Sequence, residues 1–168
     1  MFVDAMCTLL PKYPDFTAII IGPIDQRGFA AGLQARVAAA GLTERVRFLG
    51  ELPIEEVPRW YQRLTIYAFT SRNEGFGLTL LEAMAAGAAL VAARSGGAGR
   101  VVSDGETGLL VPPGDVDALV AALEPLMRVP QRAIELGRNA RARVLAEFTV
   151  DAEVERIAAV YRQVLQMD

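Results

Sequence analysis

The chain of 168 residues contains no histidine and a single cysteine, Cys7. Without histidine it cannot form a Ser-His-Asp or Cys-His catalytic triad, and it lacks the usual ligand of zinc sites. A lone cysteine excludes an intramolecular disulfide and is typical of proteins in a reducing compartment. The sequence therefore indicates a cytoplasmic protein without a histidine-dependent catalytic triad, a histidine-ligated zinc ion or an intramolecular disulfide.

Strong charge and long apolar runs are also missing. The net charge is -3, and the arginines are scattered rather than clustered, so a nucleic-acid partner is not expected. No apolar run approaches the roughly 18 residues that span a bilayer, and the N-terminus lacks the basic region of a signal peptide. A length of 168 residues with 52% hydrophobic side chains predicts one domain with a sizeable core.

Short apolar segments alternate regularly with helical patterns. We expect strands at 16–22, 45–49, 65–70, 88–93 and 108–111, and helices at 2–12, 26–40, 54–63, 78–86, 115–127, 131–146 and 151–166. The first strand is continuously apolar, which is typical of a strand buried on both faces. This alternation predicts an α/β fold, a Rossmann-like doubly wound parallel sheet with helices on both faces. Ligands of such sheets bind beyond the carboxyl ends of the strands.

Glycines mark four of the expected strand-to-helix junctions, at Gly22, Gly50, 75–77 and 96–97. At the third junction, small residues let the backbone approach a ligand, and the free N–H groups of the helix start favour an anion. Phosphate suits this position, and Thr79 would add a hydroxyl. The alternative is that the glycines only form a tight turn and that Thr79 caps the helix or bonds back to the backbone.

Two carboxylates flank this junction. Glu82 is the only charged residue between Gly75 and Ala93, and no helical neighbour can pair with it. A carboxylate in apolar surroundings is costly unless it is hydrogen-bonded, and a polyol would supply two adjacent donors. Glu74 can reach a ligand held at the helix start. The alternatives are that Glu74 is a solvated turn residue beside Arg72, and that Glu82 has an Arg or Lys partner from a distant segment.

The stretch Glu74-Gly75-Phe76-Gly77-Leu78-Thr79-Leu80-Leu81-Glu82-Ala83-Met84-Ala85 places seven residues between two glutamates. Together with the segments 45–50 and 104–115, it resembles the C-terminal, donor-binding domain of retaining glycosyltransferases of the GT-B fold, family 4. Within that family the chain is most similar to bacterial lipopolysaccharide-core mannosyltransferases. The resemblance implies that residues 1–168 form one nucleotide-sugar-binding domain. It also implies that the domain's first strand and the N-terminal acceptor domain are absent from this chain.

The resemblance assigns roles to individual residues. Glu74 would contact hydroxyls of the transferred sugar and is the candidate catalytic residue. Glu82 would bind the ribose hydroxyls, Arg47 and Phe48 would lie against the nucleobase, and Gly22 would border the donor cleft. The groups that meet the sugar and the diphosphate would come from one turn and helix start, formed by Glu74, Gly75, Phe76, Gly77, Leu78 and Thr79.

The implied function is the transfer of mannose from GDP-mannose to a lipopolysaccharide-core or other glycan acceptor. Neither a metal nor a cofactor other than the nucleotide sugar is expected. The fragment alone would be inactive, could dimerise through an exposed docking surface, and would belong to an enzyme at the inner face of the cytoplasmic membrane. The alternatives are a non-catalytic nucleotide-binding or interaction domain, and a GT-B relative such as a nucleotide-sugar epimerase.

Overall fold

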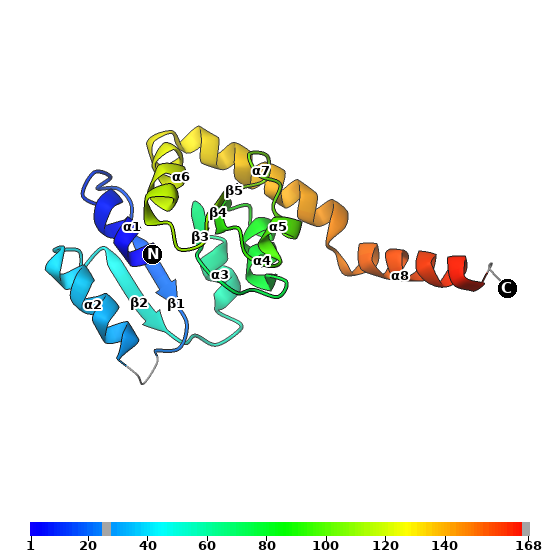
Figure 1. Cartoon of the computed structure of the whole chain (residues 1–168), viewed down its shortest axis with the longest axis horizontal. Helices are drawn as coiled ribbons and strands as arrows, with labels where there is room; N and C mark the ends of the chain where they lie inside the picture. The colour runs from blue at the N-terminus through cyan, green and yellow to red at the C-terminus, as the bar shows by residue number, and fades with distance from the viewer. Residues whose placement is uncertain (25–27, 166–168) are drawn as a thin grey trace.

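The computed structural model describes residues 1–24 and 28–165, in which helices and strands alternate (Figure 1). The elements in chain order are α1 (Phe2–Leu9), β1 (Ala18–Ile21), α2 (Phe29–Ala39), β2 (Val46–Gly50), α3 (Val57–Tyr61), β3 (Ile66–Phe69), α4 (Leu78–Ala85), β4 (Ala89–Ala93), α5 (Ala98–Val101), β5 (Leu109–Val111), α6 (Val116–Arg128), α7 (Pro130–Glu147) and α8 (Val150–Leu165).

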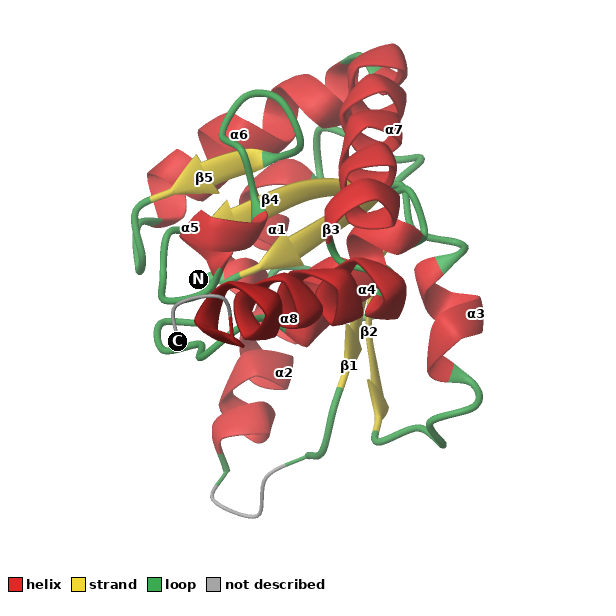
Figure 2. Cartoon of the chain, turned by 90° about the vertical axis from the view of Figure 1, so that its right-hand side faces the viewer, coloured by secondary structure: helices red, strands yellow, loops and turns green. Residues whose placement is uncertain are grey.

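Every strand pair in the described part of the chain is parallel, which confirms the predicted fold class. The strands nevertheless form two groups, β1–β2 and β3–β4–β5, rather than one continuous sheet (Figure 2). β1 pairs only with β2, so its other edge has no described strand beside it. For this reason the prediction that the first strand is buried on both faces is wrong: Ile19 and Ile20 are half-buried, and Ile21 is 37% exposed.

The central strand β4 separates two apolar cores. Ala89 and Val91 pack on one face with residues of α1 and α6, whereas Leu90 and Ala92 pack on the other with residues of α4 and α7. All five residues of β4 are buried, as expected for a strand covered on both faces. The doubly wound arrangement therefore follows from the alternation of side chains along a single apolar strand.

Several predicted helices differ from the observed ones at their ends. The predicted start of the second helix, at residues 26–27, lies outside the described residues, and α3 spans five residues instead of ten. The short helix α5 replaces what the sequence predicts as a glycine-rich loop. No described helix combines the length and apolarity that a bilayer span requires.

The last helix, α8, contains no buried residue and continues away from the rest of the molecule (Figure 1). It is amphipathic, and its large apolar side chains are exposed: Val150, Val154, Ile157, Val160, Tyr161, Val164 and Leu165. α8 therefore belongs to neither of the two cores described above.

Arg45 fixes the connection between α1 and the β1–β2 pair. Its guanidinium donates hydrogen bonds of 2.6 Å to the carbonyl oxygens of Leu10, Tyr13 and Phe16. These three carbonyls belong to the turn that leads from α1 into β1. Two of these carbonyls, those of Leu10 and Tyr13, also accept a backbone N–H of the turn at 3.2 Å. One half-buried arginine thus adds shorter, charged hydrogen bonds to acceptors outside any helix or strand.

We predict that Arg45→Met lowers the free energy of unfolding by about 2 kcal/mol, because hydrogen bonds from a charged donor to three part-buried acceptors are lost. Urea denaturation measures this change. The matched control is Arg47→Met in the same region, since Arg47 is exposed and its loss is expected to change stability by less than about 0.5 kcal/mol. Equal effects of the two substitutions would contradict the prediction.

Candidate functional site

The glycine-bearing junctions lie where the sequence places them, at the carboxyl ends of the strands. Gly22 follows β1, Gly50 ends β2, residues 74–77 lie between β3 and α4, and residues 94–97 lie between β4 and α5. Within each of the two parallel strand groups, these segments share one edge. Residues 74–79, which include most of the predicted site residues, lie at the carboxyl edge of the β3–β4–β5 group.

The turn between β3 and α4 exposes unpaired backbone donors. Gly77 is the N-cap of α4 and has a left-handed conformation (φ 89°, ψ 51°); an added Cβ would lie 2.8 Å from Cδ1 of Leu80. No side chain caps the helix, so the alternative that Thr79 does so is wrong. Within the described residues, no acceptor receives the N–H groups of residues 75–79. Phe76, Leu78 and Thr79 are exposed, so an anion from solvent can reach these donors.

Glu74 is half-buried in this turn. Its Cγ lies 3.7 Å from the position of a Cβ at Gly77, close to the start of α4. Its carboxylate makes no ion pair within the described residues, and the guanidinium of Arg72 lies instead beside Gly114. The alternative that Glu74 is a solvated turn residue beside Arg72 does not fit the half-burial of this side chain.

The loop after β4 supports the turn through backbone contact. The Gly97 N–H donates to the carbonyl oxygen of Glu74 (3.2 Å), and the Ser95 hydroxyl donates to that of Ser71 (2.8 Å). A Cβ at Gly96 would overlap the backbone of Glu74, and one at Gly97 would overlap that of Phe76. The sequence analysis missed this supporting role, although two adjacent glycines after a buried strand are a sign of close backbone approach.

The structure contradicts the prediction that Glu82 lies in apolar surroundings. Its side chain is exposed, so the argument that burial demands a ligand is wrong for this residue. The alternative of a distant Arg or Lys is also wrong, because no described residue forms an ion pair with Glu82. Tyr61, at the end of α3, lies near enough for the Glu82 carboxylate to affect the pKa of its phenol. Burial first, then Tyr67 and Glu82, raise the pKa of Tyr61 above its ordinary value.

Gly22 and Phe48 line a common hollow of about 290 Å³ at the ends of β1 and β2, whose other lining residues are mainly apolar. Arg47 precedes Phe48 on a strand, so the two side chains point to opposite faces, and Arg47 is exposed. The structure therefore does not bring Arg47 and Phe48 together against one nucleobase.

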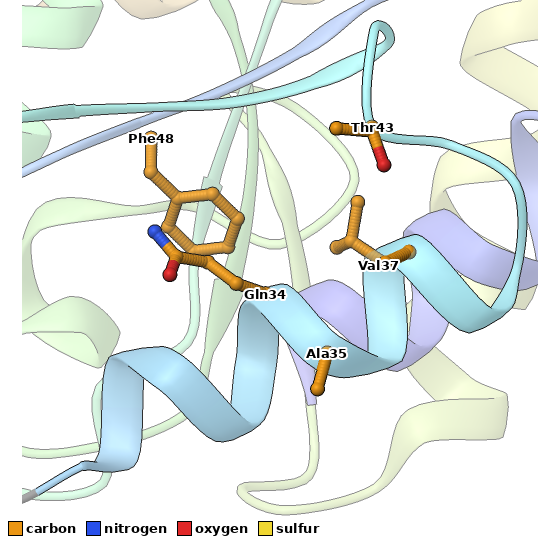
Figure 3. Close-up of a pocket in the computed structure, with 6 residues that line it drawn as sticks. Gln34, Ala35, Val37, Thr43 and Phe48 are labelled. Carbon is orange, nitrogen blue, oxygen red and sulfur yellow. The ribbon is translucent and has the colours of Figure 1, made fainter.

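A second hollow of about 520 Å³ lies between α2 and the segment from Thr43 to Phe48 (Figure 3). Its only polar side chains are those of Gln34 and Thr43, and it includes no residue of the β3–α4 turn. Nothing in it matches a phosphorylated sugar. No three His, Cys, Asp or Glu residues of the described ranges lie close enough together to hold a metal ion.

The fold and the turn define a class of protein: a Rossmann-like domain whose α4 begins with backbone donors that have no acceptor among the described residues, beside the half-buried Glu74. The chain belongs to the family described as glycosyl transferases group 1, which matches residues 1–143. Its fold is that of the C-terminal half of a GT-B glycosyltransferase.

Known proteins resemble the chain over nearly its whole length. It is 44% identical to the lipopolysaccharide core biosynthesis mannosyltransferase LpcC of Rhizobium leguminosarum bv. viciae, over 98% of this chain and 47% of that protein. The crystal structure of the C-terminal domain of a group 1 family protein (LpcC) from Francisella tularensis matches with a TM-score of 0.84 and 33% identity, over 89% of this chain and 78% of that one. Alr3699/HepE of Anabaena, in complex with UDP and glucose, matches with a TM-score of 0.84 and 29% identity, over 96% and 43%. The chain spans about half the length of the curated relatives that it matches.

We predict that Gly97→Ala lowers the free energy of unfolding by about 2 kcal/mol and displaces the β3–α4 turn, because the new methyl group overlaps the backbone of Phe76. Denaturation and amide chemical shifts of residues 74–79 measure the two effects. Gly99→Ala is the matched control: no atom lies within 4 Å of its added Cβ, and a change of less than about 0.5 kcal/mol is expected. Unchanged shifts in Gly97→Ala would show that the loop does not hold the turn.

Proposed function

We propose that the chain is the donor-binding half of a retaining glycosyltransferase that transfers mannose from GDP-mannose to a lipopolysaccharide-core or other glycan acceptor. The observation that carries the proposal is the β3–α4 turn, where unpaired N–H groups and two carboxylates meet at the carboxyl edge. The names of the relatives support the reaction, and the complex of Anabaena HepE with UDP and glucose supports a nucleotide sugar as the ligand.

The diphosphate would bind at the start of α4. No acceptor among residues 1–24 and 28–165 binds the N–H groups of Gly77, Leu78 and Thr79, and the helix dipole adds partial positive charge. When the bond between the anomeric carbon and the phosphate oxygen breaks, its electron pair remains on the diphosphate. Fixed donors at this point stabilise the charge that develops there. An acceptor hydroxyl would then form the new bond with net retention.

The two carboxylates would recognise hydroxyl groups at opposite ends of the donor. Glu74 lies beside the helix start, where the transferred sugar follows the diphosphate, and Glu82 lies one turn further along α4, within reach of the ribose. Each carboxylate can accept hydrogen bonds from two adjacent hydroxyls. The hollow between Gly22 and Phe48 would take the base, whereas Arg47 faces away from it.

The remaining contacts belong to the full-length protein. An N-terminal domain would bind the acceptor, and basic side chains from a preceding segment would neutralise the diphosphate. The parent enzyme would work as a peripheral protein at the inner face of the cytoplasmic membrane. Dimerisation of the isolated chain through an exposed surface stays a prediction.

We expect the chain to bind GDP or GDP-mannose more tightly than UDP or UDP-glucose in calorimetric titrations. Glu82→Ala should weaken this binding roughly tenfold, because hydrogen bonds to a charged acceptor are lost. The substitution should leave the midpoint of unfolding unchanged, because Glu82 is exposed. The control is Glu44→Ala, an exposed glutamate far from the turn.

Equal affinity of wild type and Glu82→Ala would contradict the assigned role of this carboxylate. A preference for uridine nucleotides would still agree with a glycosyltransferase, but it would contradict GDP-mannose as the donor. Binding of nucleotide without sugar transfer by the full-length protein would favour a non-catalytic domain, and sugar inversion without transfer would favour an epimerase.

We also predict that saturating nucleotide slows amide hydrogen exchange in residues 70–86. Within the described residues the N–H groups of residues 75–79 have no acceptor, so a bound diphosphate would give them partners. Exchange mass spectrometry with and without GDP measures the effect, and the α6 segment serves as an internal control because it lies in the other core. Equal exchange in both states would contradict a diphosphate site at this turn.

A further inference from the structure

The hollow at the ends of β1 and β2 is bounded on a further side by α2. Phe29 and Leu33, one turn apart on that helix, line it together with Phe48 of β2. Gly22 and Gly50 also line it, and their backbones are joined by a hydrogen bond from the Gly22 N–H to the Gly50 carbonyl oxygen (2.9 Å). Every described residue that lines the hollow is apolar, so its walls offer carbon faces rather than polar side chains.

The apolar stripe of α2 that packs on the strands continues beyond the core. Val37, Leu33 and Phe29 follow one another at four-residue spacing and therefore share one face of the helix. Val37 is 2% exposed and Leu33 is half-buried, and both pack in one core with Phe48. Phe29, on the same face, is 69% exposed. Its ring is thus directed to the hollow with most of its surface uncovered.

An uncovered aromatic ring beside an apolar hollow suits a flat aromatic ligand, because such rings stabilise a complex when their faces are covered. The hollow, about 290 Å³, is close to the lower limit of roughly 300 Å³ for small-molecule pockets. It accommodates one ring system rather than a whole nucleotide sugar. No ring contact joins Phe29 and Phe48 within the described part of the chain, so the space between these two walls is open.

We propose that Phe29 stacks on one face of the nucleobase of a bound nucleoside diphosphate and thereby favours a purine over a pyrimidine. The inference rests on the proposed function and extends it to the recognition of the base. An aromatic side chain can stack on the face of any base, and the larger purine offers the ring more area than a pyrimidine does. The hollow also lies at the carboxyl ends of its strands, where ligands of such sheets bind.

The test compares binding of GDP, UDP and inorganic pyrophosphate, which has no base, through amide chemical shifts that also report weak affinities. We expect Phe29→Ala to weaken GDP binding roughly five- to fiftyfold, UDP binding less, and pyrophosphate binding by less than about twofold. Phe29→Trp keeps an aromatic face and should bind GDP at least as tightly as the wild type. The matched control is Tyr161→Ala on α8, a ring that is 66% exposed, and it should change none of these affinities.

A direct readout of the contact accompanies the affinities: nuclear Overhauser effects are expected between the Phe29 ring and the base of bound GDP. Equal affinity of the wild type and Phe29→Ala for GDP would overturn the inference and leave the proposed function intact. Weakening that is equal for GDP and pyrophosphate would reveal a disturbed start of α2 and would also overturn the inference alone. Weakening that is equal for GDP and UDP would overturn the purine preference. A wild-type protein that binds neither nucleotide would overturn the proposed function and this inference together.

Discussion

The site depends on the close contact between two loop backbones at the carboxyl edge of the sheet. The N–H of Gly97 donates to the carbonyl oxygen of Glu74, and the adjacent Gly96 leaves no room for a Cβ between the loops. Ser95 adds a hydroxyl bond to the carbonyl of Ser71. These contacts set the path of the turn before α4, and that path decides which N–H groups remain without acceptors. Only glycine permits this approach of the two backbones. The N–H groups at the start of α4 that have no described acceptor therefore keep a fixed arrangement.

The rest of the fold keeps this contact in place. β4 is buried on both faces and anchors the supporting loop, while β3 pairs with β4 and anchors the turn. The two loops are therefore joined at their bases by parallel strand pairing and at their tips by the bond from Gly97. Irregular segments that carry function usually depend on such a rigid scaffold. The two cores are built mainly from alanine, leucine and valine, and β4 itself carries only alanine and valine apart from Leu90, so helices can pack closely against the strand.

The two glutamates differ in how the structure holds them. Glu74 is fixed through its own main chain, because its carbonyl oxygen is bound by the neighbouring loop. Its half-buried side chain therefore stays beside the start of α4. Glu82 lies on the exposed face of α4 and forms no ion pair within the described residues. The first carboxylate is thus placed by a contact between two loops, and the second is placed by its helix alone.

The sequence alone determined the alternation of elements, the glycine-bearing junctions and the family. These depend on local patterns: apolar runs, helical periodicity and the glutamate spacing around Gly75–Gly77. Tertiary structure decided what local patterns do not contain. The exposure of Glu82 depends on which face of α4 meets solvent. The half-exposed β1 results from strand pairing, since only one of its edges meets another described strand. Two adjacent glycines indicate a close approach of the backbone, but which segment Gly97 contacts is decided only when the chain packs.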